Sequence, residues 1–124
     1  MDAFYSKNLG APDESVRLPG LEEDWVEVGG FTVGRSVQAV GWRYSVDMSP
    51  LEGGDGWCDA HHVGIVISGR WGARLRDGTE LEFGPDDVYD CPPGHDGYTL
   101  GDEPAVMIEW SSLRPLTPDP HASS

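Results

Sequence analysis

The sequence predicts an all-β domain whose antiparallel strands close into a β-barrel or jelly roll. Short segments alternate apolar with polar residues, which is the pattern of strands with one buried face. The 17 glycines and 10 prolines supply many turns between these segments. No segment carries the apolar repeat of a long amphipathic helix. With 124 residues, the chain is long enough for one hydrophobic core and is expected to form one domain.

The expected organisation is an arm, a barrel and a tail. Residues 1–22 are polar, with Pro12, Pro19 and scattered charges, and they predict an N-terminal arm with little local structure. The barrel domain is expected over residues 23–112. Residues 113–124 contain three prolines and predict a flexible C-terminal tail.

The alternating and apolar segments predict roughly eight to ten strands, and closing them into a barrel removes exposed edges. The clearest turn is Asp77-Gly78, because this dipeptide favours the tight turns that join antiparallel strands. Trp42, Tyr44 and Val46 share one parity and are expected on one face of a strand. In chain order, the expected strands are 25–28, 31–33, 37–40, 42–46, 63–68, 71–76, 79–83, 88–91, 98–100 and 105–110.

The charge of the chain limits its partners. The net charge is −14, from 22 acidic and 8 basic residues, so no basic patch is available for nucleic acid or an anionic membrane. The first residues lack the pattern of a signal peptide, and no apolar run is long enough to span a bilayer. We therefore expect a cytoplasmic location and two cysteines that are reduced rather than paired.

Chemistry-bearing residues gather at the two ends of residues 57–95. Cys58 and His62 precede an apolar run, whereas Cys91 and His95 frame a Pro-Pro-Gly turn. Thiolate and imidazole are the ligands that zinc and other borderline metals prefer. The histidine at 61 has the opposite parity to His62 and is expected to face away.

The stretch GIVISGRWGARLRDGTELEFGPDDVYDCPPGHDGYTLGDEP resembles the core of the cupin superfamily, whose small barrels often hold one metal among inward histidines and a carboxylate. The first motif of the family reads His-x-His, three or four residues, Glu, six residues, Gly. With its last Gly at Gly69, the Glu position falls at His62, the second His at Cys58 and the first at Gly56. The chain departs from the motif at each metal position, but two of the replacements are themselves good ligands.

The second family motif reads Pro-x-Gly, two residues, His. Residues 92–94 match its start, whereas the His position falls at Gly97 and the histidine stands at His95. A shift of two residues keeps the side chain on the same face of a strand. The chain is most similar to a subgroup of single-domain cupins with Cys-x-x-x-His-x-Gly and Pro-Gly-His-Asp motifs, over most of residues 1–112. This resemblance implies a homodimer.

The resulting hypothesis is a divalent metal held by Cys58, His62 and His95 with a fourth position open. Zinc suits one thiolate and two imidazoles best, and iron, copper or nickel are alternatives. Each of the three residues can instead be a buried structural side chain. Cys91 can replace Cys58 as ligand or pair with it in a disulfide.

The expected ligand is a small molecule in the barrel mouth. Trp42 and Tyr44 are weak candidates for the pocket, because aromatic residues also pack in cores. Asp90 and Asp96 are interpreted as solvated turn residues. The functions that remain open are a metal-dependent isomerase, lyase, hydrolase or oxygenase, a non-catalytic sensor or binding module, and a metal-free cupin with a hydrophobic pocket.

Overall fold

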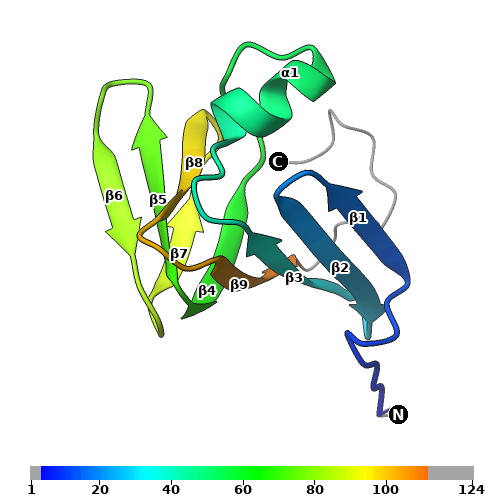
Figure 1. Cartoon of the computed structure of the whole chain (residues 1–124). Helices are drawn as coiled ribbons and strands as arrows, with labels where there is room; N and C mark the ends of the chain where they lie inside the picture. The colour runs from blue at the N-terminus through cyan, green and yellow to red at the C-terminus, as the bar shows by residue number, and fades with distance from the viewer. Residues whose placement is uncertain (1–3, 112–124) are drawn as a thin grey trace.

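Nine strands and one short helical segment form the described part of the chain, in a computed structural model that describes residues 4–111. Figure 1 shows the strands with the helical segment at one end of the molecule. The elements are β1 Glu14–Leu18, β2 Leu21–Val28, β3 Phe31–Gln38, the π-helical turn η1 Tyr44–Met48, α1 Ser49–Glu52, β4 His62–Ser68, β5 Arg70–Leu75, β6 Glu80–Phe83, β7 Val88–Cys91, β8 His95–Leu100 and β9 Ala105–Ser111.

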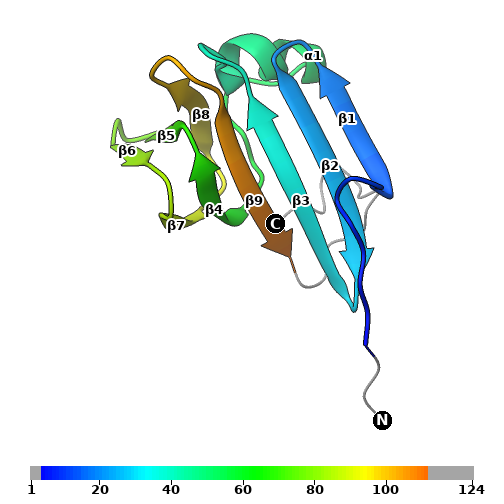
Figure 2. The ribbon, with the colours of Figure 1, turned by 60° about the horizontal axis from the view of Figure 1, so that its bottom comes forward.

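The strands form two antiparallel sheets, as the sequence predicts for a jelly roll. The larger sheet has the order β1-β2-β3-β9-β4-β7, and the smaller has the order β6-β5-β8. Strands β3 and β9 are far apart in the chain but pair over seven residues, and Figure 2 shows β1, β2, β3 and β9 side by side. In the part of the chain that the structure describes, no helix is long and apolar enough to cross a membrane.

The prediction of an arm with little local structure is wrong for Glu14–Leu18, which forms β1 and pairs with β2. A tight turn joins the two strands, and Gly20 adopts a positive φ of 76° there, where a side chain would be strained. The expected tail, 113–124, lies outside the described residues.

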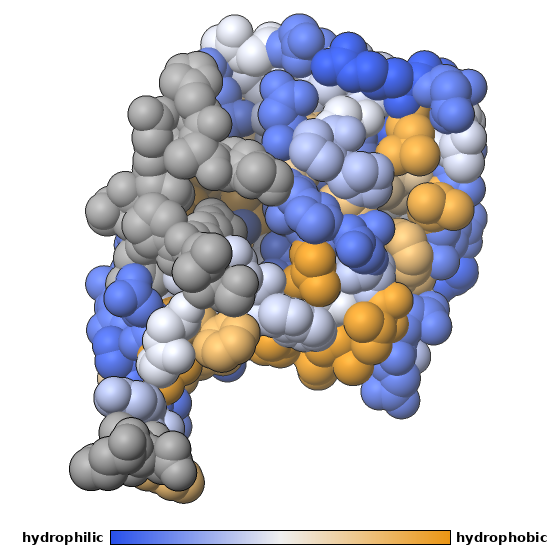
Figure 3. Space-filling view, turned by 180° about the vertical axis from the view of Figure 1, so that it is seen from behind, coloured by the Kyte–Doolittle hydropathy of each residue, from blue (hydrophilic) through white to orange (hydrophobic). Residues whose placement is uncertain are grey.

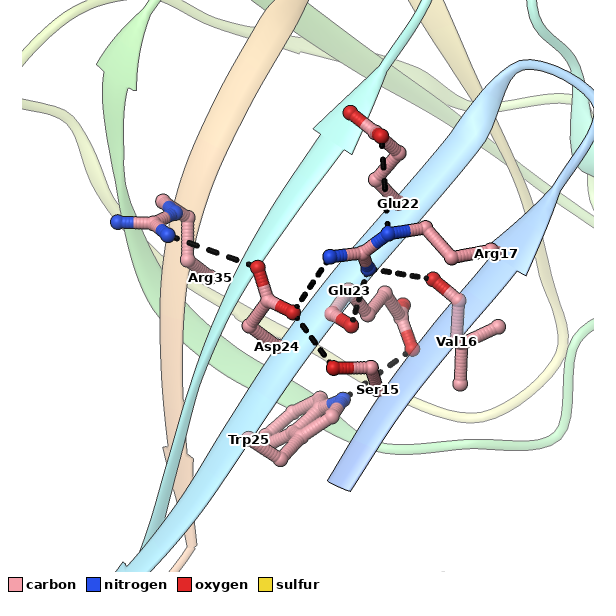
Figure 4. Close-up of polar contacts among 8 residues, drawn as sticks. All are labelled: Ser15, Val16, Arg17, Glu22, Glu23, Asp24, Trp25 and Arg35. Carbon is pink, nitrogen blue, oxygen red and sulfur yellow. Dashed lines mark hydrogen bonds and ion pairs between the residues drawn. The ribbon is translucent and has the colours of Figure 1, made fainter. Parts of the chain in front are cut away.

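Charged and polar side chains join β1, β2 and β3 on the outer face of the sheet (Figure 4). Asp24 accepts hydrogen bonds of 2.8 Å from the Ser15 hydroxyl and the Arg17 guanidinium, and its second oxygen lies 3.5 Å from Arg35. We call Ser15, Arg17, Asp24 and Arg35 the outer network. Asp24 is the register partner of both Ser15 and Arg35, and Arg17 is its diagonal neighbour on β1, so the network supports the pairing of the three strands.

The strand expected over 42–46 does not form. Arg43 makes one isolated bridge to β8, and the chain then turns into η1 and α1. The Asp47 carboxylate accepts the backbone N–H of Arg43 at 2.8 Å, and Pro50 occupies the first turn of α1. Local Asp-to-backbone bonds and an early proline favour a helical turn over a strand, and they override the alternation of Trp42, Tyr44 and Val46.

The hydrophobic core lies between the sheets and consists of Val66, Trp71, Ala73, Tyr89, Cys91, Ala105 and Met107. Trp71 stacks on Phe83 with ring centroids 5.7 Å apart and lies 5.0 Å from the Tyr89 ring. Apolar side chains also reach the surface, where Val88 is 65% exposed and Trp110 36%. Seen from behind, hydrophilic residues alternate with apolar ones, which lie along the right side and the lower part of the view (Figure 3).

Candidate metal centre

The three residues expected to bind metal come together at one end of the barrel. Cys58 lies in the segment before β4 and forms an isolated bridge with His95, His62 is the first residue of β4, and His95 is the first residue of β8. Their ligand atoms all lie within 4.8 Å of one another, and the Cys58 Sγ lies 3.6 Å from the His62 Nε2. We call these residues the Cys-His-His cluster. Among the described residues, this is the one group of His, Cys, Asp and Glu side chains with such spacing.

Backbone hydrogen bonds fix two members of the cluster against each other. The Cys58 N–H donates to the His95 carbonyl at 2.7 Å, and the Gly94 N–H donates to the Cys58 carbonyl at 2.7 Å. Gly94 has a φ of 89°, so the Pro-Pro-Gly turn requires glycine there. The turn therefore brings the start of β8 back against Cys58.

A carboxylate orients the second member. The His62 Nδ1 lies 2.8 Å from the Glu109 Oε1, and the Tyr89 hydroxyl donates to the Glu109 Oε2 at 2.7 Å. Gly64 makes room for this arrangement, since a Cβ there would lie 2.8 Å from the Glu109 Cγ and 2.9 Å from the Tyr89 hydroxyl. Three neighbouring strands, β4, β7 and β9, thus cooperate to point the His62 Nε2 at Cys58.

A backbone carbonyl orients the third member. His95 is 1% exposed, and its Nδ1 lies 2.7 Å from the Pro92 carbonyl oxygen. Because a carbonyl can only accept, Nδ1 carries a proton, and Nε2 is the ring nitrogen left for another partner. A carboxylate on one histidine and a carbonyl on the other are the partners that metal-binding histidines usually have.

The electrostatics of the cluster favour a thiolate. Burial alone would raise the pKa of Cys58, but hydrogen bonds and charge from His62 and His95 lower it to about 6. Burial alone would lower the pKa of His62, but the negative charge of Glu109 and hydrogen bonds to Cys58 and Glu109 raise it well above its ordinary value. The cluster therefore places two negatively charged groups, the Cys58 thiolate and the Glu109 carboxylate, beside the two imidazoles.

This donor set fits a tetrahedral ion. Ligand atoms in a tetrahedral zinc site lie about 3.4–3.7 Å apart, given bond lengths of about 2.1–2.3 Å. The Cys58 and His62 donor atoms already have this spacing, at 3.6 Å. The other separations among the three donor atoms are no longer than 4.8 Å.

Cys91 and His61, the other cysteine and histidine near the cluster in sequence or in the sheet, lie outside the cluster. Cys91 and Cys58 are both free thiols, and Cys91 is buried in the core with its Sγ 3.8 Å from the Pro92 carbonyl. Burial and the negative charges of Cys58, Glu109 and Asp90 raise the pKa of Cys91 to about 12. His61 faces away from the cluster, as expected, and contacts the exposed Asp90.

The interpretation of Asp96 as a solvated turn residue is wrong, because Asp96 is buried in β8. Its carboxylate accepts hydrogen bonds from the Arg43 Nε at 2.8 Å, the Ser45 N–H at 2.9 Å and the Ser45 hydroxyl at 2.8 Å. These bonds tie η1 to β8 and hold the segment that contains Trp42 and Tyr44 beside the cluster.

A cavity of about 760 Å³ opens next to the cluster. This volume lies in the usual range of small-molecule sites. Trp42 and Tyr44, the two pocket residues expected from the sequence, both line the cavity, as does Trp57. The remaining lining residues come from β2, β3, the 48–60 segment, β4, β5, β8 and β9: Leu21, Glu23, Ser36, Gln38, Met48, Glu52, Gly53, Gly54, Asp55, Cys58, Asp59, Ala60, His62, Trp71, His95, Gly97 and Glu109.

Glu109 is the site residue that the sequence interpretation missed. A signal for it existed, because Ala105, Met107 and Glu109 share one parity on β9 and the first two are fully buried. A carboxylate on the inward face of a strand is expensive unless it is paired, so it marks a hydrogen-bonded site.

Comparisons with known proteins support the fold. Neither the models of protein families nor the curated proteins gave a match. A solved chain from "Crystal structures of DMSP lyases RdDddP and RnDddQII" has a TM-score of 0.57 and 16% identity over 80% of this chain. This chain spans half of that one, 50%.

Two further solved structures are closer in length. KdgF from Halomonas sp. has a TM-score of 0.56 and 16% identity, covering 82% of this chain and 89% of its own. A cupin 2 conserved barrel domain protein from Salinispora arenicola has a TM-score of 0.54 and 22% identity, covering 76% and 77%. The fold expected from the sequence motifs is thereby confirmed: this chain is a small all-β protein with the cupin fold.

Proposed function

We propose that the protein binds a divalent metal through Cys58, His62 and His95, and a small molecule in the adjoining cavity. The observation that carries this proposal is the convergence of one low-pKa thiol and two imidazole Nε2 atoms, each fixed by an outer partner. One sulfur and two nitrogens on a tetrahedral ion suit zinc, and iron, copper or nickel accept the same ligands.

The arrangement suits Lewis-acid chemistry on a small metabolite. A metal with an open fourth position polarises a carbonyl or lowers the pKa of bound water. Glu109 and Tyr89 hold the His62 ring, while the Pro92 carbonyl holds His95. Solved structures with this fold include a chain from a structure of DMSP lyases, a sugar phosphate isomerase and an oxalate decarboxylase, which supports isomerisation or elimination as the reaction class, with hydrolysis as an alternative that the same metal chemistry allows.

The second candidate is binding without catalysis, and two observations favour it. Both Glu109 oxygens already accept hydrogen bonds, from His62 and Tyr89. Burial, then the hydrogen bond to Glu52, raises the pKa of Tyr44, so this phenol at the cavity stays protonated and serves as a donor rather than a base. A sensor that holds its ligand at the metal needs only these positioning contacts.

Metal analysis tests the proposal directly. Protein purified without chelators is expected to contain about one metal ion per chain, and Cys58→Ser and His62→Ala are expected to lose it. Cobalt added to the metal-free protein is expected to give a thiolate-to-cobalt absorption band that Cys58→Ser abolishes. His61→Ala and Cys91→Ser are the matched controls, because both residues adjoin the cluster in sequence or in the sheet but point elsewhere.

The outcome separates three cases. Full metal content in both ligand variants contradicts the proposed ligand set. Loss of metal in Cys91→Ser instead of Cys58→Ser transfers the sulfur ligand to Cys91. Absence of any bound metal, with the cobalt band also absent, leaves the metal-free cupin. The homodimer and the cytoplasmic location stay predictions, and sedimentation of the purified protein tests the first of them.

A further inference from the structure

Four polar side chains that line the cavity are buried without a hydrogen-bond partner. They are between 3% and 8% exposed, and the part of the chain that the structure describes offers no partner to the Trp42 Nε1, the Trp71 Nε1, the Ser36 Oγ or the Gln38 Oε1. An indole N–H can only donate, a Gln carbonyl oxygen can only accept, and a hydroxyl does both. Leaving buried polar atoms unpaired is costly, so a ligand that pairs them gains affinity.

One unpaired donor, the Trp71 N–H, lies near the Cys-His-His cluster. The Trp71 ring is nearly perpendicular to the rings of His62 and His95, with centroids 6.4 Å and 6.2 Å away. Its Nε1 faces Gly97 on β8, where an added Cβ would lie 3.0 Å from it. Gly97 also lines the cavity and places no side chain over this edge of the ring. The indole N–H is therefore a donor for a ligand oxygen near the cluster.

The other unpaired groups lie beside the large sheet. A Cβ added at Gly20 would lie 2.8 Å from the Trp42 Cδ1, the ring atom next to Nε1. Gly20 precedes Leu21, which is the register partner of Gln38. Ser36 and Gln38 share one face of β3, and both line the cavity. The Trp42 donor is thus close to the end of β3 that carries the unpaired oxygens.

The charge of the cavity disfavours an anionic ligand. Among the described residues that line it, none is Lys or Arg, and five carry carboxylates: Glu23, Glu52, Asp55, Asp59 and Glu109. These carboxylates repel a phosphate or a carboxylate. An ammonium group does not suit the indole donors either, because it has no lone pair with which to accept from an N–H. A neutral group that both accepts and donates fits the unpaired atoms best.

We infer that the cavity binds a small neutral hydroxylated compound, with one oxygen at the Trp71 N–H and a hydroxyl between Trp42 and Gln38. That hydroxyl accepts from the Trp42 N–H and donates to the Gln38 oxygen. The first oxygen also faces the Cys-His-His cluster, and for this end the inference rests on the proposed function. The ligand class is a diol or a hydroxycarbonyl compound rather than an amine, a carboxylate or a phosphate.

Four probes of one shape test this class. They share a cyclohexane ring with one hydroxyl and differ at the opposite carbon: trans-1,4-cyclohexanediol, cyclohexanol, trans-4-aminocyclohexanol and trans-4-hydroxycyclohexanecarboxylate. Titration of the zinc-loaded protein at neutral pH is expected to show the diol binding about fivefold more tightly than cyclohexanol, as one added neutral hydrogen bond provides. The amine is expected to bind no more tightly than cyclohexanol, and the carboxylate is compared in metal-free protein, where it cannot bind zinc.

Proton–nitrogen NMR spectra of the same samples report on the contacts themselves. The diol is expected to move the indole N–H resonances of Trp42 and Trp71 downfield, as an accepted hydrogen bond does. Cyclohexanol is expected to move only one of the two. Trp110 is the internal control, because it has the opposite parity to Glu109 on β9 and is 36% exposed.

Two variants remove the proposed partners of the second hydroxyl. Trp42→Phe keeps an aromatic ring without the N–H, and Gln38→Leu removes the acceptor at similar size. Each is expected to reduce the fivefold ratio to below about twofold, whereas Trp110→Phe is expected to keep it. If one of the two variants fails to fold, the other gives the ratio, and the NMR shifts of the unmodified protein need neither.

Two measurements keep this inference distinct from the proposed function. The metal content of each sample shows whether the metal site exists, and titrations of metal-free protein show whether the preference for the diol is independent of it. Several outcomes overturn the inference: equal binding of the diol and cyclohexanol, no binding of the diol, tighter binding of the amine, or tighter binding of the carboxylate in metal-free protein. An unmoved Trp42 resonance, or an unchanged ratio in the folded variants, also overturns it.

Discussion

The outer network and the Cys-His-His cluster use similar groups in different surroundings. In the outer network, Arg17 is 51% exposed and Arg35 39%, with Asp24 between them at 15%. At the cluster, the His62 side chain is 24% exposed and its partner Glu109 12%. Both sets link neighbouring strands through a carboxylate of similar exposure, so the difference between them lies in the burial of the basic partners.

Burial decides what each set can do. Water and salt screen the exposed charges of the outer network, so its ion pairs stabilise the fold by about 1 kcal/mol or less each. Around Cys58 and His62, the same kind of interaction acts with less screening and moves the pKa of each group far from its ordinary value. The outer network therefore supports strand pairing, whereas the surroundings of the cluster favour a thiolate at Cys58 that can bind a metal.

The largest expected difference is in the reactivity of Cys58. In metal-free Cys91→Ser protein, alkylation by iodoacetamide is expected to rise with a midpoint near pH 6, because the pKa of Cys58 is about 6 instead of its ordinary 9.0. Mass spectrometry of samples alkylated at a series of pH values gives the midpoint. His62→Gln is expected to move it upward, and added zinc is expected to protect the thiol.

The lowered pKa of Cys58 also makes the free energy of unfolding depend on pH. A lowered pKa means that the folded protein holds the Cys58 proton less tightly than the unfolded chain. This contribution to the free energy of unfolding is fully present above pH 9.0 and is lost as the pH falls through about 6. An alkylation midpoint near 9 in the folded protein contradicts the proposed electrostatics, whatever its metal content.

A smaller effect is expected from the carboxylate behind His62. Glu109→Gln keeps an acceptor for the His62 Nδ1–H but removes the negative charge, and it is expected to weaken zinc binding about 10- to 100-fold. Competition with a chromophoric chelator measures the affinity. Asp90→Asn is the matched control, since Asp90 contacts His61 on the exposed side. Equal zinc affinity in the two variants shows that Glu109 is structural only.

The sequence predicts most of the fold because strand alternation and turn residues are local signals. The expected strands at 63–68, 88–91 and 105–110 agree closely with β4, β7 and β9. The two failures have non-local or competing causes. Strand β1 is only five residues long, and it is defined by its pairing with β2 across Gly20, a contact outside the segment itself. The 42–46 segment alternates as a strand does, but Asp47 and Pro50 direct it into helical turns.

From the sequence, the site residues could be predicted only at positions that the family motifs cover. Cys58, His62 and His95 stand at or near motif positions, and the structure places them together. Glu109 and Asp96 were missed because their roles depend on partners 47 and 51 residues away, at His62 and Ser45. Contacts of that separation follow from the order of strands in the sheets, which periodicity does not determine.

The smallest expected effect belongs to the outer network, where Asp24→Asn is expected to lower the free energy of unfolding by no more than about 1 kcal/mol. Hydrogen bonds from Arg17 and Ser15 lower the pKa of Asp24, so its contribution is present above the ordinary carboxyl pKa of 3.8 and is lost as the pH falls below it. Urea unfolding of the two proteins at low and high salt measures this loss in the free energy of unfolding and its dependence on salt. The loss is expected to shrink at high salt, and zinc affinity is expected to stay unchanged because the network lies on the outer face of the sheet. A loss of several kcal/mol, or a change in zinc affinity, contradicts the view that burial accounts for the difference between the outer network and the Cys-His-His cluster.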